Sequence, residues 1–328
     1  MQLHQPLKML ALAATLASVA VPTTSTAQVY PSRPVELVIH SNPGAGQDVF
    51  GRLFAEISQR EKLLPQPFTI VNRPGGSGTV ASTFIKSKKG DPHYLLSLSS
   101  TIVLALANRP DSTLGLDSYT PVALFGFDLQ SITVPVDSRF KNFKELVEAA
   151  KQSPDSIVNG IASATGTARF LQYQIEKLTG AKFKYVSFKS GSDAMAAAMG
   201  KHVDVTMENV SEVLSGVEAK KLRILAVPAE RRLANLPDVP TLKELGFNIH
   251  VGSGRGLAMP PGVPKETLAV METAAERAHK SAAWRDYASK NMYENTYLNS
   301  AQLAQYLNRQ MPTVAEFMEF IGARKPAQ

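Results

Sequence analysis

The sequence has no cysteine among its 328 residues, and this absence excludes several classes of protein. A chain without thiols has no disulfide framework, no thiolate metal site, no cysteine nucleophile and no lipid anchor on an N-terminal cysteine. The absence is compatible with an oxidising compartment, because such a chain has no thiol to be oxidised.

The sequence also lacks a hydrophobic run long enough to cross a membrane. Its apolar stretch at residues 9–21 is shorter than the roughly 20 residues that a spanning helix needs, and no later stretch approaches that length. The stretch follows Lys8 and precedes Ser25-Thr26-Ala27, a small-residue pattern typical of a cleavage site. We therefore expect a signal peptide over residues 1–27 and export to the periplasm.

Common signatures of catalysis are missing as well. No Gly-x-Ser-x-Gly nucleophile turn occurs, and the six histidines are widely spaced with no His-x-x-x-His pair for zinc. The glycine-rich segment at residues 75–78 lacks both the Lys-Ser/Thr of a phosphate loop and the spacing of a dinucleotide fingerprint. We expect no enzyme and no cofactor, and we keep a hydrolase or other enzyme as the less favoured alternative.

Charge of one sign is not concentrated anywhere along the chain. The formal net charge of +7 comes from basic residues scattered over the sequence, so nucleic acid is not the expected partner. Hydrophobic residues make up 44% and charged residues 19%, which is ordinary for a globular protein, and the length suits two domains.

A turn between a strand and a helix near the N-terminus is the strongest positive signal. Residues 35–39 predict a buried strand, and residues 43–48 lead into a helix with Val49, Leu53 and Ile57 on its apolar face. Gly44 and Gly46 allow a ligand to approach the backbone. The free amides and the dipole of a helix N-terminus favour an anion such as a carboxylate.

The same arrangement occurs again in the second half of the chain. A predicted strand at residues 157–161 is followed by Ser163-Ala164-Thr165-Gly166-Thr167 and then by an amphipathic helix. The sequence thus predicts two small-residue turns that each lead into a helix N-terminus.

Other polar residues follow predicted strands of a parallel sheet. Strands at residues 68–71 and 94–98 alternate with helices, and ligands bind such sheets at the carboxyl ends of the strands. Ser99, Ser100 and Thr101 lie at one such end, where their hydroxyls either bind a ligand or cap the next helix. Glu208 follows another predicted strand, at residues 203–207.

Two segments are predicted to pass between two lobes. The first lies between the strands at residues 122–127 and 130–134, and the second is the glycine-rich stretch near residues 248–257. This predicts an α/β protein with lobe 1 formed by residues 28–128 and 252–328, lobe 2 by residues 129–251, and a hinge of two crossings.

Several ordered motifs resemble those of one family. They are Pro43-Gly44-Ala45-Gly46-Gln47-Asp48, Val71-Asn72-Arg73-Pro74-Gly75-Gly76, Lys189-Ser190-Gly191, Gly200-Lys201-His202-Val203-Asp204, Lys221 to Val227, and Leu236-Pro237-Asp238-Val239-Pro240-Thr241. Together they are similar to the Bug family, the periplasmic solute receptors of tripartite tricarboxylate transporters. The resemblance implies a two-lobed type II periplasmic-binding fold with two parallel-rich mixed sheets. It also implies a small carboxylate as ligand, the membrane subunits of such a transporter as partners, and a monomer.

The sequence departs from the family pattern at the expected site. His40-Ser41 replaces a common Pro-Phe pair, which makes the pocket more polar, and Arg255 stands where an aromatic residue is common. Arg255 either binds a ligand carboxylate or forms a salt bridge in the hinge. The expected ligand-binding residues are Ser41, Gly44, Ala45, Gly46, Gln47, Asp48, Ser99, Ser100, Thr101, Ser163, Thr165, Gly166, Thr167, Glu208 and Arg255. A sensor that presents its closed form to a membrane signalling partner is the alternative function.

Overall fold

The structure is a computed structural model that describes residues 29–107 and 114–323. The predicted signal peptide at residues 1–27 lies outside the described residues. Within these two ranges no helix is long and apolar enough to cross a membrane.

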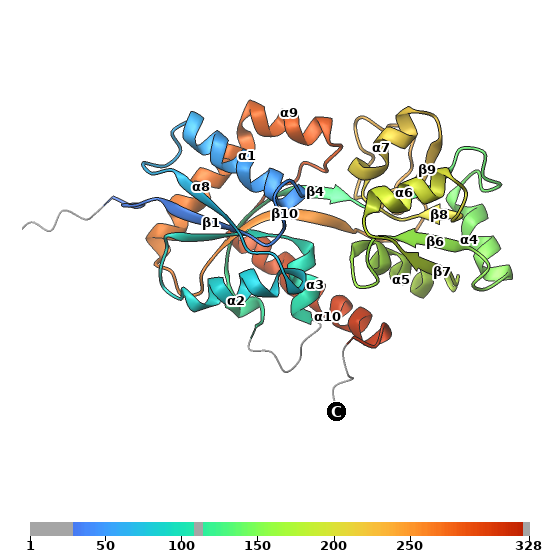
Figure 1. The fold of residues 1–328 in the computed structure, drawn as a ribbon, viewed down its shortest axis with the longest axis horizontal. Coiled ribbons are helices and arrows are strands. Elements are labelled where there is room, and N and C mark those ends of the chain that lie inside the picture. Colours follow the sequence, from blue (N-terminus) through green and yellow to red (C-terminus); the bar gives the residue numbers. More distant parts are fainter. Residues whose placement is uncertain (1–28, 108–113, 324–328) are drawn as a thin grey trace, which may run out of the picture.

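The described residues form two mixed sheets that lie side by side, each with helices packed on it (Figure 1). The larger sheet has the order β11-β4-β10-β3-β1-β2, in which β1, β2 and β3 are parallel and β10 runs antiparallel to both β3 and β4. Its strands are β1 (Val35–Ile39), β2 (Phe68–Asn72), β3 (Tyr94–Leu98), β4 (Thr120–Leu129), β10 (Gly252–Met259) and β11 (Leu298–Asn299). We call this sheet and its helices lobe 1.

The smaller sheet has the order β7-β6-β8-β5-β9, in which β6 is parallel to β7 and β8, while β5 is antiparallel to β8 and β9. Its strands are β5 (Ile132–Pro135), β6 (Val158–Ile161), β7 (Lys184–Ser187), β8 (Val205–Thr206) and β9 (Leu222–Ala226). We call this sheet and its helices lobe 2. The two mixed sheets that the sequence predicted are therefore confirmed, although neither sheet has more parallel than antiparallel strand pairs.

The helices follow the strands in alternation through most of the chain. They are α1 (Gly46–Arg60), α2 (Thr79–Ser87), α3 (Ser100–Ala107), α4 (Phe143–Gln152), α5 (Thr167–Thr179), α6 (Gly191–Met199), α7 (Val210–Glu218), α8 (Lys265–Lys280), α9 (Ala282–Lys290) and α10 (Ser300–Phe320). Two short 3-10 helices, η1 (Gly76–Gly78) and η2 (Leu116–Ser118), precede α2 and β4.

The apolar face of α1 differs from the one predicted. Phe50, Phe54 and Ile57 are buried in the core of lobe 1, whereas Val49 is 38% exposed. Ile57 belongs to both sets, and the predicted Leu53 packs partly buried against the same core. The buried apolar stripe of α1 therefore starts at Phe50, one residue later than the sequence pattern indicates, and Val49 lines the cleft described below.

Two chain segments connect the lobes at the carboxyl end of β4 and the amino end of β10. These strands pair along their length, with Gly252 opposite Leu129 and Ser253 opposite Asp128. The Gln130 amide N–H donates to the Val251 carbonyl at 3.1 Å, so the two crossings remain hydrogen-bonded between the sheets. This is a hinge of two adjacent strands.

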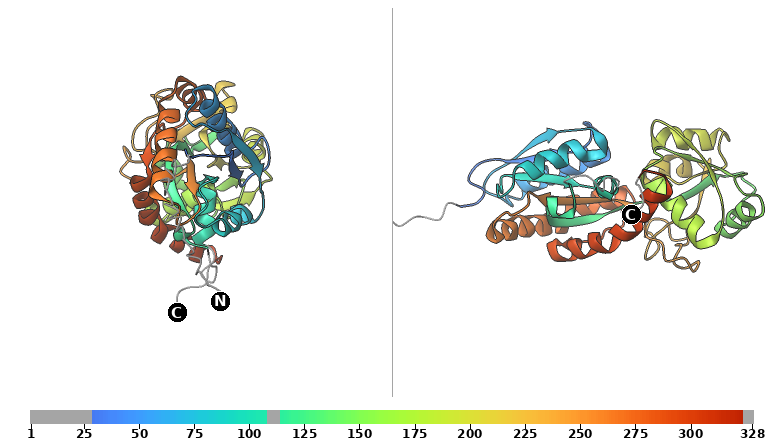
Figure 2. Two further views of the ribbon diagram at one scale, coloured as in Figure 1. Left: turned by 90° about the vertical axis from the view of Figure 1, so that its left-hand side faces the viewer. Right: turned by 90° about the horizontal axis from the view of Figure 1, so that it is seen from below.

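Helix α10 also extends from one lobe to the other, although the sequence assigned the C-terminal region to lobe 1 alone. Leu303 and Leu307 are buried in the part of α10 that packs on β4 and α3 of lobe 1, whereas Phe317 packs against Phe170 of α5 with ring centroids 5.2 Å apart. Lys177 and Glu316 form an ion pair at 2.6 Å. The right-hand view of Figure 2 shows α10, in red, running along lobe 1 and reaching the near edge of lobe 2.

Candidate functional site

A cleft between the lobes consists of two adjoining cavities of about 390 and about 440 Å³. The two cavities adjoin because they share four lining residues, Thr101, Asn209, Glu212 and Ser253. The first cavity lies between η1 of lobe 1 and the turn before α5, and the second lies between β1, α1 and the hinge strands.

The turn before α1 is held in shape by Asp48. The buried carboxylate of this residue accepts hydrogen bonds from the Gly44 amide at 2.8 Å, from Arg52 at 2.8 Å and from Asn72 at 2.8 Å. These bonds hold the pKa of the Asp48 carboxyl below its usual value, although burial opposes them. Gly44 has a φ of +84°, which side-chain-bearing residues rarely adopt. Asp48 and Gly44 therefore shape the turn.

The N-termini of α1 and α5 carry no side-chain cap. Ala45 and Gly166 occupy their N-cap positions, and neither offers a side-chain acceptor to the first amides. No side chain caps α2, α7 or α8 either, whereas Asn142, Ser190, Ser281 and Asn299 cap α4, α6, α9 and α10. Because the first N–H groups of a helix have no partner within it, α1 and α5 present free donors from opposite sides of the cleft.

The polar residues after β3 have two roles: Ser99 lines the cleft, whereas Ser100 bonds the hinge. The Ser99 hydroxyl lies 2.7 Å from His40 Nε2, and both residues line the cavity beside α1. Burial lowers the pKa of His40 to about 4, so this imidazole is neutral at neutral pH. Ser100 instead bonds the hinge strand β10, donating to the Gly252 carbonyl at 2.8 Å and accepting from the Gly254 amide at 2.9 Å.

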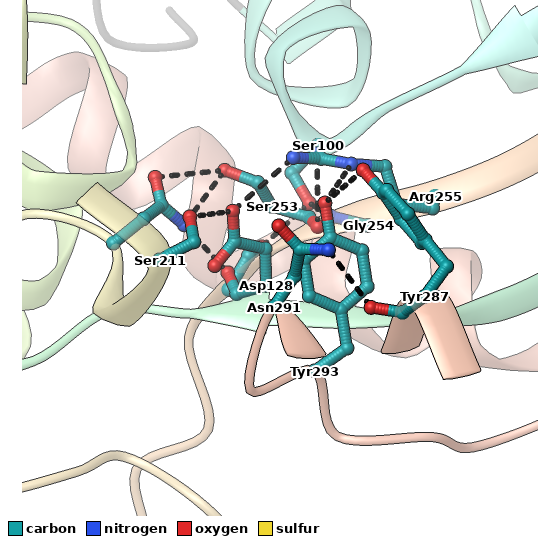
Figure 3. A network of polar contacts seen from close by, with 11 residues as sticks. Ser100, Asp128, Ser211, Ser253, Gly254, Arg255, Tyr287, Asn291 and Tyr293 are labelled. Carbon is teal, nitrogen blue, oxygen red and sulfur yellow. Dashed lines mark hydrogen bonds and ion pairs between the residues drawn. The ribbon is translucent and has the colours of Figure 1, made fainter. Parts of the chain in front are cut away.

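Arg255 lies at the centre of a network on the hinge strands (Figure 3). Its Nη2 lies 3.2 Å from Asp128 Oδ2, its Nε donates to the Tyr293 hydroxyl at 3.1 Å, and its Nη1 donates to the Ser253 carbonyl at 3.3 Å. The ion pair that the sequence offered as one role for Arg255 is therefore present. Three of the five N–H donors of a guanidinium are used in these bonds.

Three carboxylates gather on the same side of the cleft. Asp128 and Glu208 are 3% and 4% exposed, and Glu212 is half-buried. Burial raises the pKa of Glu208 to about 7, and the charge of Glu212 adds to this rise. Burial and then the charge of Asp128 raise the pKa of Glu212 above its usual value. One Glu208 oxygen accepts from the Ala162 amide at 2.5 Å.

Most of the predicted site residues line this cleft, and four do not. The lining residues among them are Ser41, Gly46, Gln47, Ser99, Thr101, Ser163, Thr165, Gly166, Thr167, Glu208 and Arg255. Gly44, Ala45, Asp48 and Ser100 line neither cavity, and they shape the α1 turn or bond the hinge.

Sequence reasoning missed several residues that the fold brings to the cleft. They are Gly76, Ser77 and Thr79 from the η1 turn, Asp128, Ser211, Glu212 and Ser253 from the hinge and α7, and Tyr287, Asn291 and Tyr293 near α9. The glycine run at residues 75–78 was a usable signal, because glycines allow a turn whose backbone a ligand can approach. The other residues carry no local signature, because long-range packing alone places them.

Another cavity, of about 710 Å³, lies on the opposite face of the hinge strands and is lined by Phe127, His250, Glu294, Tyr306 and Arg309 among others. Successive residues of a strand point to opposite faces, so Phe127 points there while Asp128 points into the cleft. The His250 ring lies 2.6 Å from Glu294, which satisfies both groups. Among the described residues no group of three or more metal-ligating side chains is placed to hold a metal ion.

Comparisons with known proteins agree with this architecture. The family model described as "Tripartite tricarboxylate transporter family receptor" matches residues 52–322. The UPF0065 protein in the gbd 5' region of Cupriavidus necator is 28% identical over 313 residues, which are 95% of this chain and 94% of that protein.

Two solved structures are similar in fold over most of the chain. A TctC solute binding protein from Polaromonas, solved without ligand, is 28% identical with a TM-score of 0.80, covering 89% of this chain and 100% of that one. MatC from Rhodopseudomonas palustris with bound malate is 23% identical with a TM-score of 0.70, covering 88% of this chain and 100% of that one.

Proposed function

Because the chain belongs to the tripartite tricarboxylate transporter receptor family, a family of solute-binding receptors and not of enzymes, we propose that it binds a small carboxylate in the interlobe cleft. We propose further that it delivers this ligand to the membrane subunits of such a transporter from the periplasm, as a monomer. The malate in MatC supports a carboxylate as the ligand class for this chain.

The observation that carries the proposal is the pair of uncapped helix N-termini. Helices α1 and α5 come from different lobes and direct free backbone donors into one cleft. A carboxylate between them accepts hydrogen bonds from both lobes at once and interacts favourably with both helix dipoles. The ligand thereby stabilises the arrangement in which the lobes are close.

The remaining predicted residues have distinct roles in this proposal. Ser41, Ser99, Thr101, Ser163, Thr165 and Thr167 offer hydroxyls along the cleft, while Gly46 and Gly166 leave the backbone accessible. Gly44, Ala45, Asp48 and Ser100 line neither cavity, and they hold the α1 turn and the hinge that position these groups. Arg255 has up to two N–H donors left for a ligand oxygen after its bonds to the protein.

Calorimetric titration of the purified mature protein with malate, succinate, citrate and aspartate tests the proposal. We expect saturable binding of at least one of these carboxylates with one site per chain. Gly166→Val should weaken that binding, whereas Ala301→Val on the exposed face of α10 should not. Absence of saturable binding to every carboxylate by a folded protein would overturn the proposed ligand class.

A further inference from the structure

Strand β7 forms an exposed edge of lobe 2. It is the last strand on one side of its sheet, and all four of its residues are exposed. The other edge strands in residues 29–107 and 114–323 are β9, β2 and β11, and none of them is exposed at every residue. An exposed edge pairs readily with another strand, so proteins usually cover, shorten or charge their edges. Among the described strands, β7 is therefore the edge most open to a partner.

The outer side of β7 has backbone groups that no strand of the sheet bonds. On its inner side β7 runs parallel to β6, and the Lys184 N–H donates to the Ile157 carbonyl at 3.0 Å. Alternate residues of a strand direct their N–H and C=O groups to opposite sides, so Tyr185 and Ser187 direct theirs away from β6. A further strand can bond to these groups, as in β-strand addition.

Large apolar side chains surround this edge. Tyr185 and Val186 of β7 are exposed, and so is Phe320 at the end of α10. Tyr185 and Phe320 line the same cavity, of about 310 Å³, beside β7. A segment that covers these side chains removes apolar surface from water, which favours its binding.

A buried cation lines this cavity as well. Arg169 of α5 is 7% exposed, and its guanidinium carbon lies 5.0 Å from the centre of the Tyr185 ring and 5.2 Å from that of Phe320. Its Nη1 lies 3.7 Å from Glu176 Oε2, beyond hydrogen-bonding distance, and neither Nη1 nor Nε has an acceptor among the described residues. The charge of Arg169 is therefore only partly compensated, which favours an anion in the cavity.

The exposed charges around β7 are mostly of the same sign. Lys182, Lys184 and Lys189 are exposed and form no ion pair with a described residue, whereas Asp155 is the only acidic residue lining the cavity besides Glu176. Two copies of β7 side by side would bring these lysines together, so pairing between copies of this chain is unfavourable. An acidic partner is attracted by the same lysines.

We propose that β7, Phe320 and the Arg169 cavity form a docking surface for an extended acidic segment of a partner protein. The segment adds as a strand on the outer side of β7 and places a carboxylate in the cavity. A protein segment fits better than a small acid, because the free backbone edge, the apolar side chains and the lysines extend beyond the cavity. This surface shares no lining residue with the two cavities of the interlobe cleft, so the inference does not rest on the proposed ligand.

Fluorescence anisotropy with labelled peptides of about eight residues tests the proposal on the purified protein. The peptides alternate Val with Glu, with Gln or with Lys, and salt at about 0.15 M suppresses unspecific attraction. We expect the Glu peptide to bind saturably, the Gln peptide to bind roughly tenfold more weakly or worse, and the Lys peptide not to bind.

Variants of β7 separate strand addition from attraction by charge. Ser187→Pro removes an outward N–H at a position where an edge strand tolerates proline, so binding of the Glu peptide should fall roughly tenfold, whereas Ser187→Ala keeps the N–H and should bind as the parent does. Lys184→Glu should also weaken binding, and Lys221→Glu, exposed beside the opposite edge strand β9, is its matched control. Thermal melting shows whether each variant folds, and Lys184→Glu keeps the test decisive if Ser187→Pro does not fold.

Several results would overturn the docking surface. One is the absence of saturable binding of the Glu peptide by the folded parent protein, and another is equal binding of all three peptides. Binding that survives in a folded Ser187→Pro variant would exclude strand addition, and free glutamate that competes as strongly as the Glu peptide would reveal a small-acid site instead. Each of these results leaves the proposed carboxylate receptor intact, because calorimetry tests the interlobe cleft separately.

Discussion

Arg255 Nη2 lies 3.2 Å from Asp128 Oδ2, and this ion pair joins the two strands that cross between the lobes. Both side chains are at least nine-tenths buried. Removing one partner of such a pair leaves a buried charge without compensation, which costs more than the pair itself contributes. The hinge therefore depends on both residues together.

Arg255→Ala should lower the free energy of unfolding by about 3 kcal/mol, because Asp128 remains buried and unpaired. Arg255→Ala combined with Asp128→Asn should be less destabilised than the sum of the two single variants predicts. Urea denaturation of the parent, both single variants and the double variant measures this difference. Strict additivity of the single effects would show that the pair is not coupled.

Arg255 is also proposed to contact the ligand, and this role predicts a separate effect. Arg255→Lys conserves the charge but lacks the planar fork of donors, so carboxylate affinity should fall, and Arg255→Ala should weaken binding by on the order of 2 kcal/mol. Calorimetry with whichever carboxylate proves to bind measures both variants. If Arg255→Ala binds as tightly as the parent while its melting temperature falls, Arg255 acts only as a brace of the hinge.

Gly46→Val and Gly166→Val should weaken ligand binding while leaving the fold largely intact. A Cβ atom at Gly46 would lie 2.9 Å from Arg255 Nη2, the end of a flexible side chain, and one at Gly166 would lie 3.1 Å from Ser163 Cβ. Gly166 has a φ of −91°, so a side chain there does not strain the backbone. Calorimetric titration measures the ligand affinity of each variant and thermal melting measures its stability, with Ala301→Val as the control. If both variants bind the ligand as tightly as the parent, the binding site lies elsewhere.

Glu208→Gln should stabilise the ligand-free protein relative to the parent as the pH rises. Burial raises the pKa of Glu208 from the usual 4.5 to about 7, so the folded state holds a proton that the unfolded state has released. The parent therefore loses stability between these two pH values, by roughly 3 kcal/mol at most, and the Gln variant does not.

Urea denaturation of both proteins at several pH values measures this difference. His40 has the opposite sign, because its pKa is lowered to about 4 and its contribution is lost as the pH falls. Comparing the variant with the parent cancels that effect. A difference between the two proteins that does not grow from pH ~5 to ~8 would contradict the assignment of Glu208.

Ligand binding should bring the two lobes together. A carboxylate between α1 and α5 bonds both helix N-termini fully only when the cleft narrows, so the ligand favours the closed arrangement. Small-angle scattering should give a smaller radius of gyration at saturation than without ligand. An unchanged radius at saturation demonstrated by calorimetry would rule out hinge closure.

Local patterns in the sequence predicted the elements that form the walls of the cleft. The strand at Val35–Ile39 and the strand at Tyr94–Leu98 begin and end where the sequence indicated. The glycine-containing turns before α1 and α5 were predicted as well, because backbone conformation at a turn and the start of a helix depend on neighbouring residues. The fold class and the family were predicted correctly from the order of these turns.

The buried face of each helix was less predictable, because packing against the sheet decides which of two adjacent apolar residues is buried. Val49 and Phe50 are adjacent apolar residues of α1, and the sheet buries Phe50 while Val49 remains in the cleft. Similarly, α10 has the pattern of an ordinary amphipathic helix, and its length carries Phe317 onto lobe 2.

The sequence by itself determined the secondary structure, the two small-residue turns and the family, because these depend on local conformational preferences and on the order of motifs along the chain. Only the tertiary structure decided the charge of the site. Asp128, Glu208, Glu212 and Arg255 are separated by up to 127 residues, and the pairing of β4 with β10 and the docking of α7 bring them together. Residues distant in sequence exclude water from this region, and this burial raises the pKa of Glu208. The same long-range packing places Asp128 beside Arg255 as its ion-pair partner.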